Sequence, residues 1–363
     1  MTGFLRRHGR RFIANALYYS GLLWVMASLR FRRRGFVLMY HRVLPAGADT
    51  FSADSICVRP ETFARQMAFL RRHFRILSIG ELAESLEAGR ELPPRSCVVT
   101  FDDGWRDNFE HALPILREQQ VPAVVFVATD YIGGQDCFWQ ERLSRLMYLA
   151  TRGGHESRAL VERTLGVADL GARAAADQRR IIREAVDTLK ARPQSEIAAI
   201  EERVRASLGE DAVNLGDDQF MNWDQVAALT RGTRVDVGSH GCSHTPLTKL
   251  AEEQAAHELG EAGRRIALAV GSPAQSIGYP NGNYDEAVIR LTRAAGYRLG
   301  FTTDKGYLGD VRDPLKLPRI NVHEGATGTM PDFLCAILMI FNRLRRAPVA
   351  RSVPKIDAHP RHG

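Results

Sequence analysis

VVTFDDGW, residues 98–105, ends an apolar run with two adjacent aspartates, Asp102 and Asp103. The apolar part predicts a buried strand, and Asp-Gly is a common turn pair. Successive side chains on a strand point to opposite faces, so both carboxylates can face one point only where the chain turns. Two carboxylates in one cleft repel, which favours a cation beside one and leaves the other available as a base. The stretch therefore predicts either an ordinary turn or part of a metal site.

Segments with strand and helix patterns alternate on both sides of this stretch. Apolar runs at 36–40, 97–101 and 123–129 predict strands, and the segments between them have helical apolar spacing. Such alternation predicts an α/β fold with a parallel sheet, whose active site lies beyond the carboxyl ends of the strands. The two aspartates stand at such an end.

The alternation stops between about 139 and 218, where the chain is rich in Ala, Arg and Glu with helical spacing. This pattern predicts a helical insert, and its charged runs indicate solvated helix faces. The sequence thus divides into a basic and apolar N-terminal segment (1–35), a catalytic domain containing the insert (36–330), and an apolar helix with a basic, disordered tail (331–363).

The composition is that of a globular protein, with 363 residues, 45% hydrophobic residues and 25% charged residues. The formal net charge is +7, and the arginine clusters lie near the termini. This distribution favours an anionic membrane surface over nucleic acid as a partner. The five cysteines are widely spread and form no Cys-x-x-Cys pair, so no disulfide framework or zinc ribbon is indicated.

The N-terminal segment RFIANALYYSGLLWVMASLR, residues 11–30, has no charge between its end arginines and is about long enough to cross a bilayer. Arginines on both flanks favour an interfacial helix or a short anchor. A signal peptide cleaved after Ala27 and a helix packed on the domain are the alternatives. We expect membrane association, on the cytoplasmic face or in the periplasm.

A second polar cluster, SHGCSHTPL, follows the strand-like residues 234–238 and contains His240 and His244. Residues four apart share a face of one helical turn, so the two imidazoles can converge on one ion. Two imidazoles and one carboxylate form a three-ligand set with open positions, as catalytic zinc and related divalent metals use. Asp103 would complete this set.

Three motifs in order, TFDDGW (100–105), SHGCSH (239–244) and GYPNGNY (278–284), resemble the polysaccharide deacetylases of the NodB-homology group, carbohydrate esterase family 4. The resemblance extends over roughly 36–322 apart from the insert. LMYHRVLP near the start is similar to members that act on exopolysaccharide. The resemblance implies a distorted (β/α) barrel with fewer than eight strands.

The resemblance also implies roles for individual residues. Asp102 would be the general base, and Asp103, His240 and His244 would bind a divalent metal, with zinc the expected ion. The backbone N–H of Asn281 would stabilise the oxyanion. These roles suit hydrolysis of an N-acetyl group, which needs a water that a metal acidifies and a carboxylate deprotonates.

Two positions depart from the family pattern. Many relatives have an arginine against the catalytic aspartate where this chain has Gly278, so another residue must hold Asp102. His41 and Arg42, at the end of the first strand, are candidates for that role, and an arginine on the surface is the other interpretation of Arg42. His323 is a weak match to the histidine that relatives use as general acid. Arg319 is an alternative residue to serve the site, and a solvent-facing loop histidine is the other interpretation of His323.

The expected function is metal-dependent removal of N-acetyl groups from amino sugars of a polysaccharide or oligosaccharide. An O-acetyl esterase is an alternative because ester and amide carbonyls pass through similar intermediates. A catalytically silent carbohydrate-binding member of the fold is another, and the intact set of two aspartates and two histidines argues against it.

Overall fold

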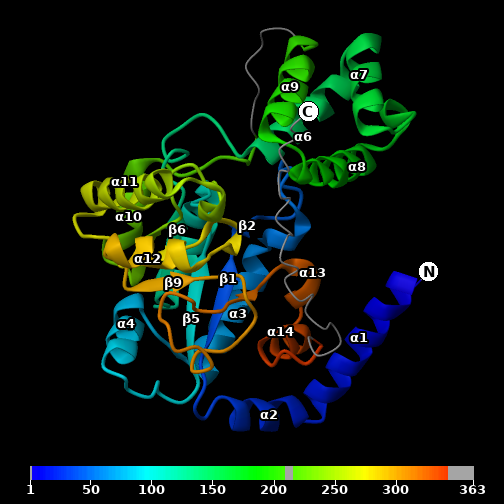
Figure 1. The fold of residues 1–363 in the computed structure, drawn as a ribbon. Coiled ribbons are helices and arrows are strands. Elements are labelled where there is room, and N and C mark those ends of the chain that lie inside the picture. Colours follow the sequence, from blue (N-terminus) through cyan, green and yellow to red (C-terminus); the bar gives the residue numbers. More distant parts are fainter. Residues whose placement is uncertain (1, 209–215, 342–363) are drawn as a thin grey trace, which may run out of the picture.

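The computed structural model describes residues 2–208 and 216–341 (Figure 1). Its strands are β1 (Phe36–Tyr40), β2 (Arg42–Val43), β3 (Cys57–Val58), β4 (Arg75–Ile76), β5 (Ser96–Phe101), β6 (Ala123–Val127), β7 (Val235–Ser239), β8 (Ser276–Gly278), β9 (Leu299–Phe301) and β10 (Ile320–Asn321). Its α-helices are α1 (Thr2–Tyr19), α2 (Leu22–Arg30), α3 (Pro60–His73), α4 (Ile79–Glu87), α5 (Leu113–Glu118), α6 (Trp139–Arg152), α7 (His155–Leu165), α8 (Ala175–Thr188), α9 (Gln194–Ala206), α10 (Trp223–Thr230), α11 (Glu252–Val270), α12 (Glu286–Ala294), α13 (Glu324–Thr327) and α14 (Met330–Ile337).

One curled parallel sheet forms the centre of the molecule. Its strands follow the order β10-β1-β5-β6-β7-β8-β9, and the short β4 pairs beside β5. A parallel bridge between Phe301 and Leu317 brings the two ends of this path together. The sheet is therefore the distorted (β/α) barrel that the sequence predicts, with seven strands in the circuit.

The strands form because their residues are almost uniformly apolar, as in sheets that are buried on both faces. Every residue of β1, β5 and β6 is buried. Helices such as α3 and α11 cover the outside with one apolar face each. Because β6 lies between β5 and β7, the residues that follow β5 and β7 meet at the same end of the barrel.

The predicted helical insert contains α6 to α9, which Figure 1 shows in green as a group beside the barrel. These helices share a hydrophobic core separate from that of the barrel, built from residues such as Leu146, Ile182, Val186, Ile197 and Ile200. Apolar side chains at helical spacing thus stabilise the insert internally, and its polar residues are available for contacts with the barrel.

The N-terminal segment forms two helices, α1 and α2, that break at Gly21, which has a φ of 78°. Among the described residues, no single helix is long and apolar enough to span a membrane. The two helices reach that length and apolar character only when they are taken together, and they are bent by 78° relative to each other. One side of α2 packs on the domain, where Leu23 is buried and Trp24 lies 5.5 Å from Phe69 between ring centroids.

The C-terminal apolar segment contributes α14, which packs against α1 and into the main core through Phe333, Leu334 and Ile337. The basic tail predicted after it, residues 342–363, lies outside the described residues.

Candidate active site

The two adjacent aspartates lie at a turn that directs both carboxylates into the protein. Asp102 still continues the sheet, because its N–H donates to Tyr40 O at 2.9 Å. Asp103 then adopts a φ of 80°, a left-handed conformation that is uncommon for residues other than glycine. Both side chains are buried. The turn therefore allows two neighbouring residues to reach one site. A left-handed conformation at a residue other than glycine is strained, and strain of this kind is typical of functional sites.

His240 and His244 lie beside Asp103. The Nε2 atoms of both histidines are 3.4 Å from Asp103 Oδ1. One ligand atom from each of the three residues lies within 4.8 Å of the others. The expectation that the histidines share a helical turn is wrong, because residues 240–244 form a loop in which Gly241 and His244 have φ values of 73° and 60°.

Contacts behind the histidine loop hold the imidazoles in place. His240 Nδ1 lies 2.6 Å from Gly278 O, so Nδ1 carries the proton and Nε2 is free to bind a metal. Glu258 of α11 accepts hydrogen bonds from the backbone N–H groups of Cys242 and Ser243 at 2.6 and 3.0 Å. The Phe138 ring stacks on the His244 ring, with 4.3 Å between centroids.

This donor set fits a divalent metal. Two imidazole nitrogens and one carboxylate oxygen are the ligands of catalytic zinc sites, and the three residues face one point. His240 Nδ1 donates to Gly278 O, and Asp103 Oδ2 accepts from the indole N–H of Trp105, so Nε2 of His240 and Oδ1 of Asp103 are left to face a metal.

Burial and the opposite charges govern the electrostatics of the site. Burial would raise the pKa of Asp103, but hydrogen bonding with His240 and the neighbouring imidazoles hold it well below its usual value. Burial lowers the pKa of His244 to about 4. For His240, burial opposes the charged form, but Asp103 and Asp102 outweigh it and raise the pKa. The site therefore holds ionised carboxylates that suit a cation.

Arg319 holds Asp102 in this site. Its Nη1 and Nη2 atoms donate to Asp102 Oδ1 and Oδ2 at 2.6 and 2.8 Å, and its Nε donates to Thr302 O. The arginine is fully buried. His41 is also close, with Nε2 3.8 Å from Asp102 Oδ2.

The structure explains why this arginine does not come from position 278. A Cβ atom at Gly278 would lie 2.9 Å from the Phe126 ring and 3.2 Å from His240 Nδ1. Any side chain there would displace one of them. The arginine that contacts Asp102 is instead Arg319, which lies just before β10, on the other side of the point where the barrel closes.

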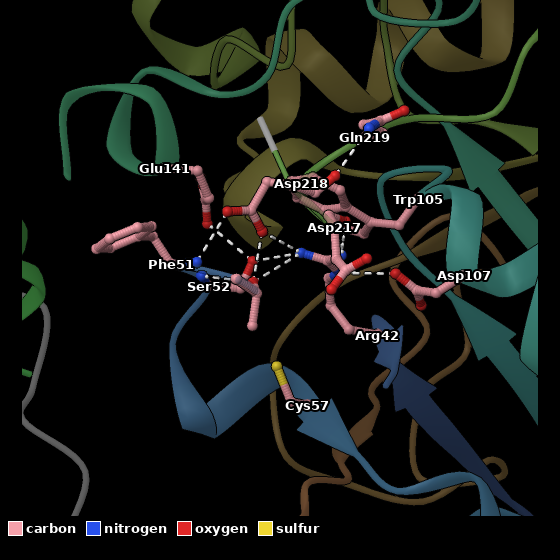
Figure 2. Close-up of polar contacts among 12 residues, drawn as sticks. Arg42, Phe51, Ser52, Cys57, Trp105, Asp107, Glu141, Asp217, Asp218 and Gln219 are labelled. Atoms are coloured by element: carbon pink, nitrogen blue, oxygen red, sulfur yellow. Dashed lines mark hydrogen bonds and ion pairs between the residues drawn. The ribbon is translucent and has the colours of Figure 1, made fainter. Parts of the chain in front are cut away.

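Arg42 does not contact Asp102, and the expectation that it does is corrected here. Its guanidinium lies in a buried polar network, which Figure 2 shows. There it pairs with Asp107 and Asp218 at 2.8 Å each and donates to Asp217 O at 2.6 Å. Alternation along the chain accounts for this, since the neighbouring His41 is the residue that faces Asp102.

The two remaining predicted residues lie on loops. Asn281 is exposed and has a φ of 59°, directly after Pro280 in the segment beside the histidine loop. His323, directly before α13, is half-buried, and its backbone carbonyl accepts a hydrogen bond from Oγ1 of Thr327, the last residue of that helix. Their roles in oxyanion stabilisation and proton donation stay predictions.

Sequence reasoning missed Trp105, whose indole Nε1 donates to Asp103 Oδ2 at 2.8 Å. The sequence did contain a sign of this contact, because the tryptophan, whose indole can donate a hydrogen bond, stands two residues after the aspartate proposed to bind the metal.

Comparison with known proteins identifies the family. The family model described as polysaccharide deacetylase matches residues 89–300, more than half of the chain. The chain belongs to the polysaccharide deacetylase family. The matched residues include the two aspartates and the two histidines described above.

Individual relatives of this deacetylase are distant. Poly-beta-1,6-N-acetyl-D-glucosamine N-deacetylase from Escherichia coli K12 is 32% identical over 102 residues, which make up 28% of this chain and 15% of that protein. The match therefore spans a small part of the relative's length.

Solved structures share the fold. The Streptococcus pyogenes deacetylase PplD, solved in complex with acetate, has a TM-score of 0.53 and 16% identity, with 84% of this chain and 98% of that chain covered. IcaB from Ammonifex degensii has a TM-score of 0.53 and 17% identity, with 84% and 97% covered.

Proposed function

We propose that this deacetylase removes N-acetyl groups from amino sugars of an exopolysaccharide, with a divalent metal, zinc, bound by Asp103, His240 and His244. The convergence of these three ligands beside the Asp102–Arg319 pair is the observation that carries the proposal. The name of the Escherichia coli relative supports an N-acetylated amino sugar as substrate.

Asp102 would act as the general base. Burial opposes its ionisation, but the charge of Arg319 lowers its pKa, so it is ionised at neutral pH and can accept a proton from water. The two-point contact with Arg319 fixes the plane of the carboxylate. A divalent ion in this site would supply Lewis acidity toward water and the acetyl carbonyl. We assign oxyanion stabilisation to the Asn281 N–H and proton donation to His323 on the family pattern.

Acetate release from matched saccharides tests this function. The protein is stripped with a chelator, reloaded with zinc, and given β-1,6-linked N-acetylglucosamine oligomers or O-acetylated oligosaccharides. We expect release from the N-acetylated substrates only, loss of release on chelation, and about one zinc per chain by elemental analysis. His240→Ala and His244→Ala should each remove the zinc.

The outcomes separate the alternatives. Release from O-acetylated substrates alone would identify an esterase. Zinc binding without release from any substrate would favour a silent binding member, and undiminished zinc in both histidine variants would overturn the ligand assignment.

We also propose that the outer faces of α1 and α2 bind an anionic lipid surface. Phe12 and Tyr19 on α1, and Leu22, Val25 and Leu29 on α2, are exposed. Each set recurs at helical spacing, which makes an apolar stripe on the side not covered by the domain. Exposed arginines at 10, 11 and 32–34 flank these stripes and complement anionic headgroups.

A further inference from the structure

The root of the helical insert lies against the turn that carries the metal ligand Asp103. The root is residues 217–220, where the chain returns from the insert to the barrel. Arg106 N donates to Gln219 O at 2.8 Å, and Met221 N donates to Gly104 O at 3.0 Å. These two bonds form a short antiparallel bridge centred on Trp105 and Phe220.

The side chain of Trp105 connects this bridge to the ligand. Its indole N–H donates to Asp103 Oδ2, and Asp103 Oδ1 is the oxygen that faces both histidines. A donor on one carboxylate oxygen determines the orientation of the other, and such supporting contacts tune metal affinity. The position of the Trp105 ring therefore affects the position of the metal-binding oxygen.

Two groups hold the Trp105 ring between them. The Phe220 ring stacks on it, with 4.2 Å between centroids and an interplanar angle of 17°. The Arg42 guanidinium carbon lies 4.1 Å from the centroid. Two groups this close to one centroid must occupy opposite faces of the ring. Trp105 is fully buried, so the contacts have little freedom to relax.

Arg42 is in turn held by both parts of the protein. From the barrel, Asp107 accepts its Nε–H. From the root, Asp218 accepts from Nη1 at 2.8 Å, and the Asp217 carbonyl accepts from Nη2 at 2.6 Å. Figure 2 shows these dashed contacts converging on the guanidinium. Arg42 and Asp218 are each 0% exposed in their side chains, and a buried pair of this kind fixes geometry.

From these contacts we infer that Arg42 and Asp218 are positioning residues through which the helical insert sets the geometry of the metal ligand Asp103, with Trp105 as the link. The inference rests on the proposed metal-dependent function. It gives the insert a role in the site although none of its helices supplies a ligand. Neither Arg42 nor Asp218 touches the reacting atoms.

Zinc affinity of the full chain tests the inference. The dissociation constant for zinc is measured on chelator-stripped protein by competition with a chromogenic chelator. Trp105→Phe keeps an aromatic ring in the stack but removes the pyrrole part of the indole with its N–H, so we expect it to raise Kd by about 10–100-fold. Asp218→Asn keeps the shape but weakens the hold on Arg42, and we expect a smaller rise in Kd of about 3–10-fold.

The double variant distinguishes a shared route from independent effects. If Asp218 acts through the Trp105 N–H, then Asp218→Asn in the Trp105→Phe background should add little to Kd. Ile200→Ala is the matched control, because it opens a cavity in the core of the insert, away from its root. It should lower the melting temperature and leave Kd unchanged.

The inference is overturned if Trp105→Phe binds zinc as the wild type does, or if Ile200→Ala raises Kd as much as Asp218→Asn. If the Asp218→Asn chain does not fold, the comparison of Trp105→Phe with Ile200→Ala tests the inference instead. Failure of the proposed function itself would look different, because the wild-type protein would then bind no zinc or release no acetate.

Discussion

Arg319 and Asp102 form a buried, two-point ion pair at 2.6 and 2.8 Å, although 217 residues separate them in the chain. The strand order makes this possible, since β10 pairs with β1 and β1 pairs with β5. The arginine thus reaches Asp102, the proposed general base, across one intervening strand. It makes the contact that the family resemblance led us to expect from an arginine at position 278, where this chain has Gly278.

Arg319→Lys should lower kcat for acetate release by roughly 10²-fold, a typical cost of misplacing a catalytic group. Lysine keeps the charge but cannot form the planar two-point contact. Arg319→Ala is a poorer test, because it leaves Asp102 buried and unpaired at a cost of about 3–5 kcal/mol. Zinc affinity measured alongside should change little, and a lysine variant with wild-type kcat would contradict the positioning role.

Asp102→Asn should retain zinc while acetate release falls by roughly 10²–10⁴-fold, the usual contribution of a positioned base. The amide has nearly the same shape but cannot accept a proton from water. Asp103→Asn is the comparison, and it should weaken zinc binding as well. The two adjacent aspartates would lose their assigned roles if Asp102→Asn kept full deacetylation with a normal zinc content.

The metal-site residues could be predicted because each lies in a short local motif. Asp102 and Asp103 are adjacent at the end of one strand, and His240 and His244 lie in one loop. The helical turn predicted for the histidines was wrong because spacing does not reveal a left-handed residue such as His244. Sequence spacing alone cannot distinguish a loop that converges from a helix face.

Contacts between distant segments could be predicted less well. Arg42 and His41 were the candidates for holding Asp102. Arg319, by contrast, was expected only as an alternative to His323. Strand order and side-chain direction place Arg319, and not Arg42, against Asp102. The Arg42–Asp218 pair joins residues 176 apart. Nothing in the local sequence of either residue indicates its partner. The strands and the parallel sheet were predictable because long apolar runs and their alternation with helices carry that information, whereas the barrel was expected from the family resemblance.

Glu141→Gln should change how stability depends on pH. Burial, followed by the charge of Asp218, raises the pKa of Glu141 to about 7. An acid with a raised pKa binds extra protons in the native state, so its contribution to stability falls as pH rises from about 4.5 to about 7. The glutamine variant lacks this loss. The difference in free energy of unfolding between the variant and the wild type should therefore be about 2–3 kcal/mol larger, in favour of the variant, at pH 8 than at pH 4.5.

Urea unfolding of both chelator-stripped proteins at several pH values measures this difference. Glu110→Gln, at an exposed glutamate on the barrel, controls for removal of a charge. A gap between Glu141→Gln and the wild type that stays constant from pH 4.5 to 8 would show that the pKa of Glu141 is the same in the native and unfolded states, and would contradict this prediction.

The apolar face of α2 offers a test of membrane binding that leaves the core intact. Leu22, Val25 and Leu29 are 46%, 56% and 59% exposed. Replacing all three with serine should lower binding to vesicles containing anionic lipid by about 10²-fold or more, because each loses part of the 1.5–3 kcal/mol that burying such a side chain contributes. Sedimentation with phosphatidylglycerol vesicles at low salt measures the loss.

Leu268→Ser is the matched control, because Leu268 is 73% exposed on α11, far along the chain from α2. It should leave vesicle binding unchanged. Deleting the whole segment is less informative, since Leu23 and Phe31 are fully buried and their removal would open the main core. Anionic vesicles should bind more protein than neutral ones, and added salt should reduce the difference, because the flanking arginines act through screened charge. A wild-type chain that sediments with neither kind of vesicle would contradict the proposal that this face binds lipid.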